Sequence, residues 1–103
     1  MPKDLPLEEG APAQRNEILK TKDGSETQNV YRYFSKKTVK ENFDIYLAYL
    51  KNAGWEILGS SLAAEGAVMG AKKIGQPGTL QVSIAKNNIT QDVSVEINLS
   101  VQN

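Results

Sequence analysis

The side chains that could do acid–base chemistry in this chain are carboxylates, lysines and hydroxyls, because it contains no cysteine and no histidine. Thiolate nucleophiles, thiolate zinc sites and disulfides are therefore excluded. The commonest general base near neutral pH and the commonest transition-metal ligand are missing too. What remains for catalysis is a set of carboxylates and lysines.

The positions of the carboxylates favour structural or solvent-facing roles. Glu8 and Glu9 lie in a proline-rich segment, and Glu41 stands where the start of a helix would use it. Asp92 and Glu96 lie on the polar side of an alternating strand, which offers no cleft to raise the pKa of one of them, as paired-carboxylate hydrolysis requires. We therefore expect no enzyme activity, no catalytic residue, no cofactor and no metal site.

The composition also indicates which classes of partner are disfavoured. Lysine plus arginine and aspartate plus glutamate both number 12, so the net charge is zero. Because nucleic-acid binding depends on surplus basic groups that release counterions from phosphates, we expect no nucleic-acid partner. The pairs Lys36–Lys37 and Lys72–Lys73 are interpreted as ordinary edge or loop charges. No apolar run approaches the ~20 residues of a membrane-spanning helix, so we expect no transmembrane segment.

Three aromatic residues are candidates for ligand binding: Trp55, Tyr31 and Tyr33. Trp55 could stack on a sugar or contact a partner, but a position directly after a helix favours closure of the core. Tyr31 and Tyr33 share one face of a strand, while Val30 and Phe34 share the other. If Val30 and Phe34 point inward, the two tyrosines stand exposed and form a stacking surface. Ordinary cross-strand packing explains the tyrosines equally well, and the zero net charge favours it.

One helix must position several of these groups. Thr38 and Glu41 have the spacing of a capping box, and Gly54 stands where a left-handed residue would end the helix. The pattern predicts a helix over 39–53 with one apolar face. That face carries Val39, Phe43, Tyr46, Leu47, Leu50 and Ala53.

Six segments have the composition or alternation of strands. They are 15–22, 30–35, 55–62, 67–74, 79–86 and 92–101. Pro77 and Gly78 suit a type II turn between the fourth and fifth segments. The last segment alternates throughout, with Val93, Val95, Ile97, Leu99 and Val101 inward and Asp92, Ser94, Glu96, Asn98 and Ser100 outward. Such a strand is buried on one face only, as in an antiparallel sheet with one wet face.

These elements predict an α+β fold in which a single amphipathic helix packs on one face of a mostly antiparallel sheet, in the order β-β-α-β-β-β-β. Residues 1–14 contain three of the four prolines and no periodic pattern. We expect 1–14 to be a flexible or extended lead-in, partly disordered, and 15–103 to form a single domain.

The order of these motifs resembles small uncharacterised domains of bacterial secreted proteins and lipoproteins. The resemblance rests on Pro6, Gly10, Ala11 and Pro12, on Tyr33-Phe34-Ser35, on the helical Phe43, Tyr46 and Leu50, and on Ala53-Gly54-Trp55. It implies an extracytoplasmic, non-enzymatic domain, in the periplasm or at the cell surface, and transfers no functional residue. An export signal would then be absent from this sequence, and the lipobox cysteine of a lipoprotein is missing.

The first functional hypothesis is a non-catalytic binding or structural module that acts through protein contacts, with another envelope protein or with a second copy. An open antiparallel sheet permits this through the addition of a strand at its edge. The alternative is a small-ligand or carbohydrate-binding domain that uses Trp55, Tyr31 and Tyr33 as exposed aromatics. Burial of Trp55 without an adjoining pocket would argue against the alternative.

Overall fold

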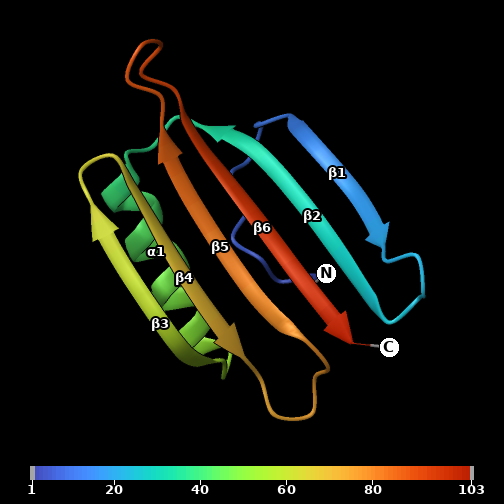
Figure 1. Ribbon diagram of the computed structural model, residues 1–103. Helices are drawn as coiled ribbons and strands as arrows, with labels where there is room; N and C mark the ends of the chain where they lie inside the picture. The colour runs from blue at the N-terminus through green and yellow to red at the C-terminus, as the bar shows by residue number, and fades with distance from the viewer. Residues whose placement is uncertain (1, 103) are drawn as a thin grey trace.

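Within residues 2–102, the chain forms one six-stranded antiparallel sheet with a single helix on one of its faces (Figure 1). The computed structural model describes residues 2–102. In chain order the elements are β1 (Ala13–Lys20), β2 (Glu26–Ser35), α1 (Val39–Asn52), β3 (Glu56–Ala63), β4 (Gly66–Lys72), β5 (Thr79–Lys86) and β6 (Val93–Gln102). The strands lie side by side as β1-β2-β6-β5-β4-β3. The predicted fold class and element order are confirmed.

The helix begins and ends where its local signals predict. The Thr38 hydroxyl accepts a hydrogen bond from the Glu41 amide, and the Glu41 carboxylate accepts one from the Thr38 amide, both at 3.1 Å. At the other end Gly54 has a φ of +85°, and the amide of Trp55 donates to the carbonyl of Leu50 at 2.9 Å. This bond across a left-handed residue is the Schellman arrangement, and it returns the chain directly into β3.

The strands differ from prediction mainly at their ends. β2 begins at Glu26, four residues before the expected start, because the polar residues 26–29 pair with β1 and β6 despite lacking strand-forming composition. β4 ends at Lys72 instead of residue 74, and Gly75 and Gly78 both have positive φ in the turn that follows. A side chain at Gly78 would lie 2.4 Å from the carbonyl oxygen of Ser100, so this turn also needs glycine for space.

The predicted alternation of the last strand is confirmed, and it defines the inner face of the sheet. In β6, the residues Val93, Val95, Ile97 and Leu99 are buried, while the polar residues between them are half-buried. Because β6 pairs with β2 on one side and β5 on the other, its inward row continues into both neighbours. The core therefore lies between this inner face of the sheet and the elements that pack on it.

The helix covers only half of this face. Six strands spaced about 4.8 Å apart span about 24 Å, whereas a helix with its side chains is about 10 Å wide. α1 packs on β3, β4 and β5, and in Figure 1 the chain that precedes β1 passes behind β2 and β6, on the same side as the helix. Leu5 and Ala11 from this segment pack against the core, and the Tyr49 hydroxyl donates to Asp4 at 2.7 Å.

Residues 2–12 are therefore the second part of the covering layer, an extended segment in contact with both helix and sheet. β1 begins at Ala13, two residues before the boundary predicted for the lead-in. The first residue of the predicted lead-in, Met1, lies outside the described residues. The sequence pattern did not reveal this role, because the segment's contacts are with residues far along the chain.

A buried pair of tyrosines joins the two layers. The hydroxyl oxygens of Tyr33 in β2 and Tyr46 in α1 are 2.7 Å apart, and both side chains are buried. Burial raises the pKa of both phenols, so both hydroxyls are neutral at physiological pH. Each hydroxyl satisfies the other in a place that water does not reach.

The substitution Tyr46→Phe should destabilise the fold by about 1–3 kcal/mol, because it leaves the buried hydroxyl of Tyr33 without a partner. The double variant Tyr33→Phe/Tyr46→Phe should be more stable than Tyr46→Phe, since it removes both polar groups. Urea unfolding followed by circular dichroism measures this difference. A double variant that is less stable than the single one would contradict the account of the pair.

Candidate functional site

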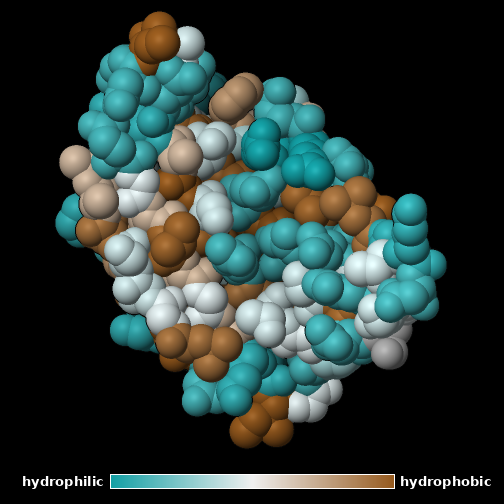
Figure 2. All heavy atoms as spheres, viewed as in Figure 1, coloured by the Kyte–Doolittle hydropathy of each residue, from teal (hydrophilic) through white to brown (hydrophobic). Residues whose placement is uncertain are grey.

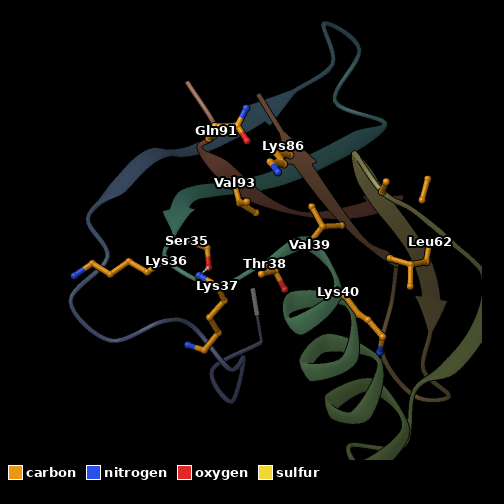
Figure 3. A pocket seen from close by; sticks show the side chains of 12 residues that line it. Ser35, Lys36, Lys37, Thr38, Val39, Lys40, Leu62, Lys86, Gln91 and Val93 are labelled. Carbon is orange, nitrogen blue, oxygen red and sulfur yellow. Dashed lines mark hydrogen bonds between the residues drawn. The ribbon is translucent and has the colours of Figure 1, made fainter. Parts of the chain in front are cut away.

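A cavity of about 600 Å³ lies where α1 begins and where β2, β3 and β5 end (Figure 3). This volume is in the range typical of small-molecule pockets. Its apolar surface comes from Val39 of α1, Leu62 of β3 and Val93 of β6, and Figure 3 shows these three side chains around one space. The remaining lining residues are Ser35, Lys36, Lys37, Thr38, Lys40, Ala63, Ala64, Lys86 and Gln91.

The sheet register and the helix start place these side chains. Lys86 and Val93 are partners across the β5–β6 ladder, so both side chains lie on the inner face of the sheet. Val39 is the first residue of α1, directly after the Thr38 cap. The connection from β5 to β6 turns around Asn87, whose side-chain oxygen accepts hydrogen bonds from two amides of the loop. Antiparallel pairing and helix capping thus bring distant segments to one corner of the molecule.

The charge in this corner is positive although the chain as a whole is neutral. Four lysines line the cavity and no carboxylate does. Lys37 is 3.2 Å from Glu8, and Lys40 is 2.8 Å from Asp44. Within residues 2–102, the ammonium groups of Lys36 and Lys86 have no carboxylate at salt-bridge distance. The N-terminus of α1 adds the positive end of the helix dipole, which the Glu41 carboxylate of the capping box partly offsets.

Glu8 of the covering segment holds one wall of the cavity together. Its carboxylate accepts hydrogen bonds from the Ser35 hydroxyl at 2.8 Å, from the Lys36 amide at 2.9 Å and from the Lys37 ammonium at 3.2 Å. Burial by itself would raise the pKa of this carboxyl, but these hydrogen bonds and the charge of Lys37 outweigh it and lower the pKa. Glu8 lies in the segment that was expected to be a flexible or extended lead-in, and nothing in the residues around it indicates this role.

Asn42 completes the same network from the helix side. It is the one buried polar residue of the described chain, with 2% of its surface exposed. Its side-chain amide donates to the Ser35 hydroxyl and to the Thr38 carbonyl, both at 3.0 Å. Asn42 falls three residues after Val39 and four before Tyr46, and this helical spacing in the sequence indicates a position on the buried face of α1.

The structure does not bring the predicted aromatic residues to a common surface. Trp55 is 6% exposed and Tyr33 is 1% exposed, Tyr31 is half-buried, and none of them lines the cavity. Lys73 lies 5.9 Å from the centre of the Trp55 ring.

The arrangement in which Val30 and Phe34 point inward together is wrong. β2 pairs Tyr31 with Ile97 and Tyr33 with Val95, which are inner-face residues. The two tyrosines therefore face the core, and Phe34 is the exposed aromatic of this strand, at 46%. Val30 is buried, but it pairs with Asn98 on the outer face of the sheet.

The two edges of the sheet differ in how they are protected. β1 carries Arg15, Glu17 and Lys20, and Arg15 forms ion pairs with Glu17 at 2.8 Å and with Glu96 at 3.5 Å. β3 has no charged residue and no proline from Ile57 to Ala63. Charges, prolines and β-bulges are the usual devices that keep an edge strand from pairing with another chain. Both edge strands have a register shift, between Ala13 and Arg15 in β1 and between Ile57 and Gly59 in β3, so charge is what distinguishes them. β3 is therefore the less protected edge.

Replacing Glu8 by glutamine should destabilise the protein by about 1–3 kcal/mol at pH 7, because the hydrogen bonds to the charged carboxylate weaken. The lowered pKa of Glu8 in the folded state means that its contribution is present above the ordinary carboxyl pKa, and is lost as the pH falls through the lowered value. The advantage of the parent over Glu8→Gln should therefore shrink on acidification. Urea unfolding from pH 7 down to about pH 3 measures it.

The neighbouring variant Glu9→Gln is the matched control, since Glu9 is exposed. It should match the parent protein across the pH range. A constant difference between Glu8→Gln and the parent, or an equal effect of Glu9→Gln, would contradict the role assigned to Glu8.

Comparison with protein-family models, with curated proteins and with solved structures found no match to this chain. The resemblance to domains of bacterial secreted proteins therefore stays a prediction. α1 is shorter and more polar than a membrane span requires, and residues 2–102 contain no other helix. No group of three or more potential metal ligands forms in that part of the chain either.

Proposed function

We propose that the chain is a non-catalytic module that acts through protein contacts, and that its contact element is the free edge of β3. The observation that carries this proposal is that β3 has no charged residue from Ile57 to Ala63, whereas the other edge strand, β1, carries three. An edge strand presents unpaired amide and carbonyl groups, which another strand can extend by hydrogen bonding. Leu58 and Leu62 on this strand are 55% and 44% exposed and add apolar contact.

The partner we assign to this edge is β3 of a second copy. Antiparallel pairing of two identical strands is two-fold symmetric, so each contact occurs twice. A charge near the two-fold axis would oppose its own copy, but the centre of β3 carries Gly59, Ser60 and Ser61. Glu56 lies at the end of the strand and is 3.8 Å from Lys72, away from that axis.

The surface around this strand supports the proposal. Figure 2 shows paler and browner residues over β3 and β4 than over β2 and β6, where hydrophilic residues gather. The outer face of β4 adds Val68, which is 46% exposed and pairs with Ser61. Pairing of two copies would extend the six-stranded sheet continuously across both molecules.

A non-catalytic role is supported by how the titratable groups are used. A general acid needs a raised carboxyl pKa near the working pH, whereas that of Glu8 is lowered by the hydrogen bonds it accepts. Burial and the hydrogen bond to Asp4 raise the pKa of Tyr49 to about 12, so its hydroxyl stays neutral. These groups hold the covering segment in place.

We also propose an extracytoplasmic setting, which rests on the resemblance of the sequence to domains of bacterial secreted proteins. The lack of cysteine neither supports nor opposes this setting. Fractionation of cells that express the complete natural gene tests this location. Recovery in the cytoplasmic fraction alone would contradict it.

Substitution of Ser61 by lysine should weaken dimer formation at least tenfold, because it places two like charges close together near the two-fold axis of the paired strands. Sedimentation equilibrium over a concentration series measures the dissociation constant. The fold should be unaffected, since Ser61 is exposed, and circular dichroism checks this. Gln14→Lys, on the exposed edge strand β1, is the matched control and should dimerise like the parent protein. A parent protein that stays monomeric up to millimolar concentration would contradict the proposal.

A further inference from the structure

We propose that the cavity at the start of α1 binds a small amphiphilic anion, a carboxylate on an apolar body of ~10–20 non-hydrogen atoms. This inference does not require the pairing of β3, although Leu62 belongs to both surfaces. The volume of about 600 Å³, the apolar floor and the excess of lysines each restrict the ligand. A second cavity, lined by Leu19, Lys20 and Glu26 among others, has only about 130 Å³ and includes a carboxylate.

The floor of the cavity suits an apolar body. Val39 and Val93 are 5% and 7% exposed, so they form the closed end, while Leu62 at 44% forms the rim. No aromatic ring lines the cavity, and the stacking platform on which sugar recognition often relies is therefore missing. A flexible or compact hydrocarbon fits this lining better, because apolar burial is not directional.

The head group is assigned to Lys86. Its ammonium has no carboxylate at salt-bridge distance within residues 2–102, and its strand position places it beside Val93. Figure 3 shows Lys86 and Val93 together on the sheet side of the cavity, with Lys40 on the helix side and Lys36 extended away. A ligand anion at Lys86 would thus lie near the apolar floor.

Two further contributions favour an anion over a neutral ligand. The ion pair of Lys40 with Asp44 is exposed, at 72% and 56% of the two side chains, so it is weak and Lys40 can turn toward a ligand. The first turn of α1 directs its positive dipole end to the same corner. Lys86 offers one unpaired positive charge beside the apolar floor, and a singly charged carboxylate matches it better than a phosphate monoester with a charge near −2.

Titration of the protein with sodium decanoate, followed by two-dimensional amide NMR and by calorimetry, tests the proposal. We expect saturable binding of one decanoate per chain, with shifts concentrated in residues 36–40, 62–64, 86 and 91–93. Octanoate, which is two methylenes shorter, should bind about 15-fold more weakly, because each buried methylene contributes roughly fourfold in affinity. Neutral decanol and decyltrimethylammonium should bind at least tenfold more weakly than decanoate. Equal binding of decanol, or shifts centred elsewhere, would overturn the proposal.

Variants distinguish the contact between Lys86 and the carboxylate from non-specific apolar binding. Lys86→Gln should weaken decanoate binding about 5- to 10-fold, as expected for loss of one charge-assisted contact. Leu62→Asp, on the exposed rim, should weaken decanoate binding more than Lys86→Gln does, because it places a negative charge beside the ligand and removes an apolar contact. Lys72→Gln is the matched control, because Lys72 is the last residue of β4 and does not line the cavity. This variant should bind decanoate as the parent protein does. Amide spectra confirm that each variant is folded. Equal affinities for Lys86→Gln and the parent would overturn the assignment.

Discussion

A helix about 10 Å wide cannot cover one face of a six-stranded sheet that is about 24 Å wide, and the rest of the structure depends on how this mismatch is resolved. α1 lies over β3, β4 and β5. The inward side chains of β6 and β2, including Ile97 and Tyr33, then need a second cover. Residues 2–12 supply it, and the carboxylate of Glu8 fixes them to the turn between β2 and α1.

The off-centre helix also explains where the two candidate surfaces lie. Because α1 sits toward β3, it packs on the inner side of that strand but leaves its hydrogen-bonding edge free. At the start of α1 the helix, the Glu8 network and the ends of three strands meet without filling the space between them, and the cavity results. Both surfaces are thus consequences of one geometric constraint.

Features encoded by neighbouring residues could be predicted from the sequence. The capping box of Thr38 and Glu41 and the left-handed Gly54 act within a few residues, and the alternation of β6 needs only a strand with one wet face. The inward face of Tyr31 and Tyr33 could not be predicted, because it depends on the register of β2 against β6. Either face of β2 carries apolar residues, so the pattern alone left both orientations open.

The candidate site was harder to predict from the sequence than the fold. Glu8 contacts residues 27 to 29 positions away, and the cavity is lined from five separate elements and loops. Lys36 and Lys37 looked like ordinary surface charges because nothing local indicates that Lys37 pairs with Glu8. Long-range pairing of a polar lead-in with a strand end leaves no periodic trace in the chain.

The central claim is that residues 2–12 form part of the covering layer, and hydrogen exchange of a chain that begins at Ala13 tests it most directly. The claim predicts a loss of about 2–4 kcal/mol in unfolding free energy, from the lost burial of Leu5 and Ala11 and the lost bonds to Glu8. Amide protection should fall most in β2 and β6 and least in β4. Unchanged stability, or a loss of protection spread evenly over all strands, would contradict it.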